Sequence, residues 1–193
     1  MKQLLYASLF VGLTSGCAFA PQAVLLSTKV EVAPSQVGGG RELPVNVVDE
    51  RPKKTLGTVA PGNIGADISL EGNLVATVQE AIGEGLSRMN FKQAAARAGA
   101  KHELRIEIRN LDYTVIRGFW AGTLRVDAGL KAICVRDGLR PYEKLHTGEF
   151  VESVQVVQPK EANARYISAA LSSAVNALLA DKELVACLSQ GAS

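Results

Sequence analysis

Residues 104–116 read LRIEIRNLDYTVI, a run in which apolar and polar side chains alternate at almost every position. Strict alternation places one set of side chains on each face of a strand, so the run predicts a long β-strand with one buried face. The alternation changes phase after Ile108, because Leu111, Tyr113 and Val115 carry on the apolar series. A change of phase by one residue predicts a β-bulge near Asn110.

The same alternation appears in residues 124–134, LRVDAGLKAIC, and the pair Asp137-Gly138 follows shortly after them. Asp-Gly is typical of the two-residue turn that joins antiparallel strands. A third strand is therefore expected to begin near Tyr142. These three consecutive strands predict an antiparallel meander.

Upstream, residues 43–48 read LPVNVV and end at a polar stretch, which predicts a buried strand followed by a turn. Apolar residues then recur at helical spacing over residues 74–89, with Asn73 as the N-cap. Residues 166–178 show the same spacing, which predicts a second amphipathic helix. Asp181 is expected to cap a short terminal turn that runs to Leu188.

This order of strand, helix, three strands and helix predicts an α+β fold. We expect a two-layer sandwich, with a mixed, mostly antiparallel sheet of about four strands and two amphipathic helices packed on one face.

The first residues of the chain have the pattern of a bacterial lipoprotein leader. Lys2 supplies a positive start, an apolar run follows, and residues 13–17 read LTSGC. The apolar run has about 10 residues, whereas a membrane-spanning helix needs roughly 20. The pattern predicts cleavage before Cys17 and acylation of its thiol and amine. The alternative is ordinary secretory cleavage after Ala20, which Pro21 disfavours at the scissile bond.

Location and domain organisation follow from this leader. Ala18 stands where an Asp would retain the protein in the inner membrane, so we expect the outer membrane, with the protein facing the periplasm. Residues 1–16 are the predicted signal peptide, and residues 17–42, which contain Gly38-Gly39-Gly40 as a hinge, are the predicted acylated tether. Residues 43–193 are predicted to form a single α+β domain.

Composition limits the partners that the protein could have. The formal net charge is only +2, so no nucleic acid or other polyanion is implied as a partner. Cys134 and Cys187 remain as a pair in an oxidising compartment. They form either a disulfide or two small buried apolar side chains.

No catalytic or metal-binding constellation is recognisable in the sequence. The two histidines, His102 and His146, lie 44 residues apart without ligand-type spacing around them, so we expect surface histidines and no metal site. Gly-x-Ser-x-Gly does not occur, and Ser168, Ser172 and Ser173 are expected to be polar helix positions. We therefore expect no enzyme activity and no cofactor.

Two segments are candidates for binding. Asp49-Glu50-Arg51 could recognise an anion or a partner through bidentate hydrogen bonds, or its charges could pair with one another. Residues 117–122 read RGFWAG and place Phe119 and Trp120 in a glycine-flanked hairpin tip. Such aromatic residues either anchor a partner or fold back on the sheet edge.

The chain resembles the YajG-type bacterial lipoproteins over nearly its whole length. The resemblance rests on the leader that ends at Cys17, on residues 45–51 (VNVVDER) and on the helix within residues 74–91. It also includes residues 104–108 (LRIEI) and residues 167–171 (ISAAL). The resemblance implies an outer-membrane lipoprotein and transfers no active site.

We therefore expect a lipid-anchored envelope protein that binds the membrane through its N-terminal acyl chains. Its domain is expected to be a non-catalytic binding or assembly module for an envelope protein. The alternative is a carrier of a small apolar or cell-wall-derived ligand, held in a pocket between helices and sheet.

Overall fold

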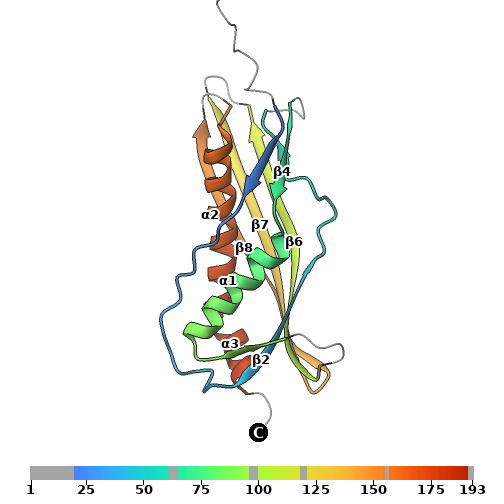
Figure 1. Cartoon of the computed structure of the whole chain (residues 1–193), viewed down its shortest axis with the longest axis vertical. Helices are drawn as coiled ribbons and strands as arrows, with labels where there is room; N and C mark the ends of the chain where they lie inside the picture. Colours follow the sequence, from blue (N-terminus) through green and yellow to red (C-terminus); the bar gives the residue numbers. More distant parts are fainter. Residues whose placement is uncertain (1–19, 61–64, 96–99, 118–120, 155–156, 191–193) are drawn as a thin grey trace, which may run out of the picture.

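The computed structural model of the chain describes residues 20–60, 65–95, 100–117, 121–154 and 157–190. These residues form an α+β fold in which one large, curled, mixed sheet of eight strands packs against helices (Figure 1). The described residues form three helices. The expectation of about four strands and two helices in a simple two-layer sandwich was therefore wrong.

The predicted meander forms the largest part of the sheet. Its strands are β6 (His102–Ile116), β7 (Gly122–Arg136) and β8 (Leu139–Val154), each antiparallel to the next. The register shifts between Ile108 and Asn110, which confirms the predicted bulge. Asp137 and Gly138 join β7 to β8 with φ values of 53° and 78°. Both values are positive, as a type I′ hairpin turn requires.

The second edge of β6 carries β2, which confirms the strand predicted over residues 43–48, and four short strands that the sequence did not reveal lie beyond it. β2 (Glu42–Asp49) pairs in parallel with residues 104–108, and β3 (Gly57–Thr58) pairs with Tyr113 further along the same edge. β4 (Asp67–Glu71) continues from β3, β1 (Gln22–Leu25) pairs in parallel with β4, and β5 (Lys92–Ala94) pairs with β2. Strands of two to five residues are too short to show an alternating pattern, and long-range partners define them.

Two of the three helices that the structure describes, α1 and α3, begin where the capping residues predict. α1 (Leu74–Arg88) starts after Asn73, whose side chain accepts a hydrogen bond from the Ala76 amide at 3.1 Å. α2 (Lys160–Leu179) begins six residues before the predicted apolar stripe. Asp181 caps α3 (Lys182–Ser189), which is a full helix of two turns where we had expected a single turn.

α2 lies along β7 and β8 on one face of the sheet (Figure 1). The closest approach is at Gly148 of β8, where an added Cβ would lie 2.2 Å from the carbonyl oxygen of Ala170. Between the layers lies a core of fully buried side chains, which include Leu104, Ile106, Ile108, Leu124, Leu130, Ile167 and Leu171.

The segment before β2 also packs on this body. Val24, Leu26 and Val30 are buried in the same core cluster. The amides of Gly38 and Gly40 donate hydrogen bonds to Met89 and Asn90 at the end of α1. The triple glycine is therefore a bonded turn and not a hinge, while the domain boundary at residue 43 stays a prediction.

Candidate functional site

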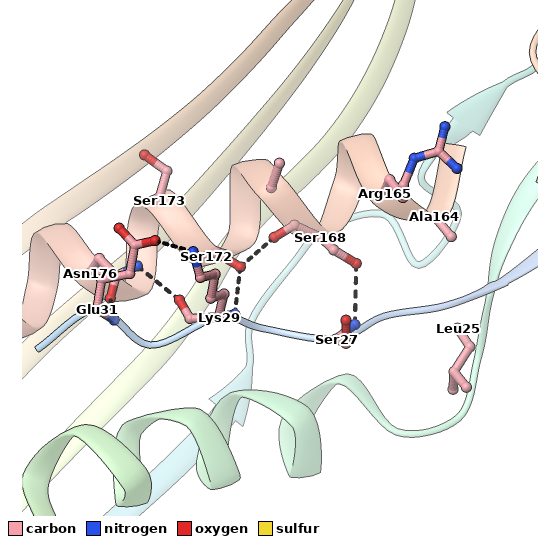
Figure 2. A pocket seen from close by; sticks show the side chains of 11 residues that line it. Leu25, Ser27, Lys29, Glu31, Ala164, Arg165, Ser168, Ser172, Ser173 and Asn176 are labelled. Atoms are coloured by element: carbon pink, nitrogen blue, oxygen red, sulfur yellow. Dashed lines mark hydrogen bonds and ion pairs between the residues drawn. The ribbon is translucent and has the colours of Figure 1, made fainter. Parts of the chain in front are cut away.

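Residues 27–31 run as an extended segment along the surface of α2, and side chains of the helix bind the backbone of the segment (Figure 2). The amides of Ser27, Lys29 and Glu31 donate hydrogen bonds to Ser168 Oγ (3.1 Å), Ser172 Oγ (2.9 Å) and Asn176 Oδ1 (2.8 Å), respectively. The Asn176 amide also donates to the Lys29 carbonyl at 2.9 Å. We call this arrangement the side-chain ladder.

The ladder works because two periodicities match. Two residues of extended chain advance about 6.7 Å, and four residues of α-helix advance about 6.0 Å. Every second amide of the segment therefore meets every fourth residue of the helix. Ser168 and Ser172, which the sequence presented only as polar helix positions, hold the N-terminal segment in place. The four-residue spacing of Ser168, Ser172 and Asn176 is visible in the sequence. It indicates a binding surface only once residues 27–31 are known to lie beside it.

A groove lies beside the ladder, and polar side chains form most of its lining. Besides the ladder residues it is lined by Leu25, Ala164, Arg165, Ala169 and Ser173. The lining therefore offers hydrogen-bonding groups and charges together with apolar surface.

A buried amide cluster fastens the start of β1 to the start of α2. Asn163 is fully buried, accepts a hydrogen bond from the Tyr113 hydroxyl at 2.8 Å and donates to Gln22 Oε1 at 2.8 Å. Gln22 and Asn163 also donate to the Gln158 carbonyl, at 3.1 and 3.2 Å. Burial raises the pKa of the Tyr113 hydroxyl, so this group remains a neutral donor.

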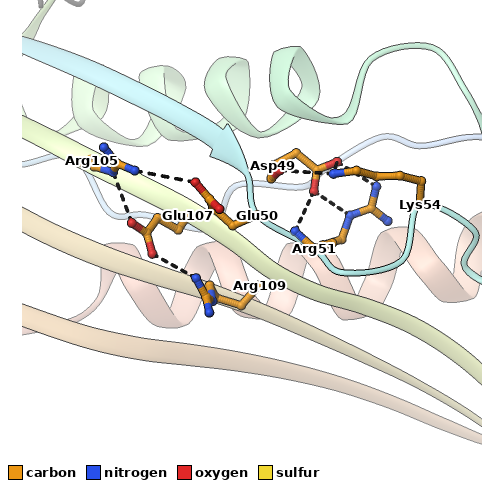
Figure 3. A network of polar contacts seen from close by, with 7 residues as sticks. All are labelled: Asp49, Glu50, Arg51, Lys54, Arg105, Glu107 and Arg109. Carbon is orange, nitrogen blue, oxygen red and sulfur yellow. Dashed lines mark hydrogen bonds and ion pairs between the residues drawn. The ribbon is translucent and has the colours of Figure 1, made fainter.

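The charged candidate at the end of β2 pairs internally (Figure 3). Arg51 Nε and Nη2 donate to the two oxygens of Asp49 at 2.9 and 3.0 Å, and the Lys54 ammonium lies 3.1 Å from Asp49 Oδ2. The hydrogen bond from Arg51 lowers the pKa of Asp49 to about 2, although burial opposes the shift. Because Asp49 occupies the bidentate edge of Arg51, that edge is not available to an outside anion. Within the described part of the chain, Arg51 Nη1 is buried without a hydrogen-bond partner.

The neighbouring charges on β6 form a partly exposed row, in which Arg109 is exposed and the Glu107 side chain is only 12% exposed. Arg105 lies 3.7 Å from Glu50 and 3.2 Å from Glu107, and Arg109 lies 3.3 Å from Glu107 (Figure 3). Pairs of this kind at the surface contribute little to stability. The row is a solvated face of the strand.

The histidines do not lie together. His102 is half-buried at the start of β6, whereas His146 on β8 is only 6% exposed, so the expectation of a surface position was wrong for His146. His146 Nε2 is 2.9 Å from the Tyr142 hydroxyl. Among the described residues, no group of three His, Cys, Asp or Glu side chains could hold a metal ion.

Asp181 lies next to this pair at the start of α3. Burial raises the pKa of its carboxyl, but the Lys144 ammonium at 2.7 Å and hydrogen bonds from backbone amides outweigh burial and lower the pKa to about 2. The carboxylate therefore stays charged and caps the helix.

Cys134 and Cys187 are joined in a disulfide with an S–S distance of 2.09 Å, which ties α3 to β7. Cys17, Phe119 and Trp120 lie outside the described residues, so their predicted roles stay predictions. In the part of the chain that the structure describes, none of the helices has the length and apolar character needed to cross a membrane.

The fold is that of an α+β domain whose N-terminal segment is strapped along a helix. Residues 28–189 match the model of a family described as "Uncharacterized lipoprotein", so the chain belongs to this family of lipoproteins. This membership confirms the lipoprotein class that the leader predicts. A comparison with curated proteins finds no match.

Two solved structures share the fold. Protein XCC0632 from Xanthomonas campestris is 16% identical, with a TM-score of 0.50 over 81% of this chain and 93% of that one. A putative neuraminyllactose-binding hemagglutinin homolog from Helicobacter pylori is 10% identical, with a TM-score of 0.51 over 86% of this chain and 97% of that one. At these identities the likeness concerns the fold alone.

Proposed function

We propose that this protein is a YajG-type lipoprotein, held at the periplasmic face of the outer membrane by acyl chains on Cys17. The match of residues 28–189 to a lipoprotein family carries this proposal, because a leader of the lipoprotein pattern directly precedes the matched region. Several acyl chains on one residue make membrane attachment effectively permanent.

Metabolic labelling with an alkyne-bearing fatty acid, followed by membrane fractionation, tests the anchor. We expect the native protein to carry the label and to fractionate with the outer membrane. Cys17→Ser should lose the label, whereas Ser15→Ala, a small-for-small exchange two residues earlier, should keep it. Label retained by Cys17→Ser, or native protein released in soluble form on lysis, would contradict the proposal.

The domain itself acts, in this proposal, as a non-catalytic binding or assembly module. The groove beside the side-chain ladder supports this role, because its exposed Arg165, Ser27 and Ser173 can donate hydrogen bonds to a polar partner surface. Carriers of apolar ligands have predominantly apolar pockets. This lining combines charged and hydroxyl groups with apolar surface, as protein–protein interfaces do, and so supports a protein partner.

Photocrosslinking in intact cells separates the two roles. A photoreactive side chain would replace Arg165 in the groove or Trp120 in the predicted tip, with the exposed Arg140 at the opposite end of β8 as the control position. A discrete protein adduct from position 165 or 120, absent from position 140, supports the module. Adducts with lipids or small molecules alone would favour the carrier.

A further inference from the structure

The part of the chain next to the proposed anchor is held rigidly. The amide cluster around Asn163 fixes Gln22, β1 pairs with β4 over residues 22–25, and the side-chain ladder fixes residues 27–31 on α2. Leu26 and Val30 anchor the same segment in the core. From Gln22 onward, the chain therefore moves with the body.

Only a short link remains between the body and the lipid. Four residues separate Cys17 from Gln22, and the five residue-to-residue steps between them span at most about 18 Å in any conformation. A free tether over the 25 residues from Cys17 to Glu42 would have a root-mean-square length of about 28 Å and would let the body turn in any direction. Because residues 22–31 are fixed on the body, the protein does not have this rotational freedom.

The chain enters the body at one end of its long axis (Figure 1). β6 ends at Ile116, β7 begins at Gly122 and β8 ends at Val154, and all three points lie at that end. The start of α2 is there as well, because Gln22 bonds to Gln158 and Asn163. We call this the proximal end. The distal end carries α3, the disulfide and the Asp137-Gly138 turn.

We infer that the proximal end lies against the phospholipid headgroups of the bilayer that holds the acyl chains, with the long axis of the body pointing away from the membrane. This inference rests on the proposed acylation of Cys17. The length of the free link carries it, since about 18 Å of chain keeps the attached end near the membrane surface and prevents the distal end from facing the membrane while the proximal end points away.

The proximal surface is compatible with that contact. Ile116 is 57% exposed there, and the exposed Arg117 follows it in the chain, so this end offers both an apolar side chain and a cation. This pairing suits an interface in which the apolar group meets acyl chains and the cation meets phosphate. Leu139 at the distal end is exposed as well, at 72%, so apolar exposure alone does not decide the orientation.

Two exposed positions at opposite ends of β8 allow a matched test. Ser153 lies at the proximal end and Arg140 at the distal end, and 13 residues of strand separate them by about 43 Å. The acylated protein, purified from membranes and reconstituted in phosphatidylethanolamine–phosphatidylglycerol vesicles, would carry a fluorophore on Ser153→Cys or on Arg140→Cys. The native cysteines do not compete, because Cys134 and Cys187 are bonded and Cys17 is acylated in the proposal.

Nitroxide attached to the lipid headgroups quenches fluorophores that approach the membrane surface. We expect the label at position 153 to lose most of its emission and the label at position 140 to keep it. A control with 12 Gly and Ser residues inserted after Ala20 adds a flexible link of about 20 Å and should restore emission at position 153.

Flotation of the vesicles distinguishes failure of the inference from failure of the proposed function. Protein that floats with the vesicles but shows equal quenching at both positions, or quenching that the insertion does not change, overturns the orientation alone. Protein that does not float overturns the proposed acylation, and the orientation falls with it.

Discussion

Among single residues, His146 makes the stability of this protein sensitive to pH. Burial lowers its pKa below the usual 6.5; the Lys144 ammonium adds to this effect and the Asp181 carboxylate opposes it. In the unfolded chain the imidazole takes up a proton near pH 6.5, whereas in the folded protein it does so only at lower pH. The stabilisation is therefore complete above pH 6.5 and is lost as the pH falls from 6.5 toward the folded-state pKa.

Urea unfolding at pH 8.0 and pH 5.5 tests this linkage. We expect the free energy of unfolding to be lower at pH 5.5, because the unfolded chain binds a proton that the buried imidazole does not, and the loss cannot exceed about 1.4 kcal/mol per pH unit. His146→Gln, which retains a hydrogen-bonding group near Tyr142, should lose most of this dependence. Asp49 and Asp181 do not interfere, since both pKa values are about 2 and their contributions are lost only below about pH 4. An unchanged pH dependence in His146→Gln would contradict the assignment.

The packing of α2 on β8 depends on the absence of a side chain at Gly148. A Cβ there would meet backbone atoms of α2, at 2.2 Å from the Ala170 oxygen and 2.4 Å from the Ala174 nitrogen. Backbone cannot move aside without shifting the helix. We expect Gly148→Ala to lower the free energy of unfolding by about 3 kcal/mol.

Gly85→Ala is the matched control for this substitution, measured by the same denaturant titration. A Cβ at Gly85 would meet the end of the Leu179 side chain at 2.3 Å, and that side chain can change its rotamer. Alanine also has a higher helix propensity than glycine. A loss in Gly85→Ala as large as that in Gly148→Ala would refute the distinction between backbone and side-chain contacts.

The disulfide stabilises the attachment of α3. Cys134 and Cys187 are 53 residues apart, and closing a loop of that size stabilises the folded state by about 4 kcal/mol in the chain-entropy model. The double variant Cys134→Ala/Cys187→Ala should unfold at clearly lower denaturant concentration than the native protein, and added reductant should lower the midpoint of the native protein but not that of the variant. If reductant does not change the unfolding of the native protein, the bridge is absent in solution.

For the molecule as a whole, the strapped N-terminal segment is a part of the folded unit. Leu26 is 8% exposed and packs in the core, whereas its neighbour Leu25 is 65% exposed. We expect Leu26→Ala to lower the free energy of unfolding by about 2–3 kcal/mol and Leu25→Ala to change it by less than about 0.5 kcal/mol. Thermal and urea unfolding of the mature chain measure both. Equal, small effects would mean that residues 20–32 are a loose tether.

Sequence patterns predicted the elements whose partners are close along the chain. β6, β7 and β8 follow one another with short turns, so alternation together with Asp137-Gly138 was enough to place all three. β1, β3, β4 and β5 were missed because each has five residues or fewer and pairs with a distant segment. The sheet therefore has twice the expected number of strands, and it curls where β3 and β4 continue the edge of β6 beyond β2.

The residues of the candidate site likewise divide into those that the sequence predicted and those that only the structure revealed. The sequence identified the Asp49-Glu50-Arg51 charges as a candidate site. Only the structure shows that Arg51 donates two hydrogen bonds to the Asp49 carboxylate and so cannot bind an outside anion through the same edge. Ser168 and Ser172 look like ordinary polar helix positions until residues 27–31 are placed beside them. The expectation of a surface position for His146 was wrong because burial of a lone histidine depends on packing between distant segments, which no local pattern encodes.

By itself, the sequence determined the lipoprotein class, the α+β composition, the meander with its bulge, and the caps of α1 and α3. These features depend on local physics, since periodicity, capping side chains and turn residues act within a few positions of one another. Only the tertiary structure decided the extent of the sheet, the Cys134–Cys187 bridge, the burial of His146 and the strapping of residues 22–31 along α2. Each of these depends on contacts between segments far apart in the chain, and such contacts arise only when the whole core closes.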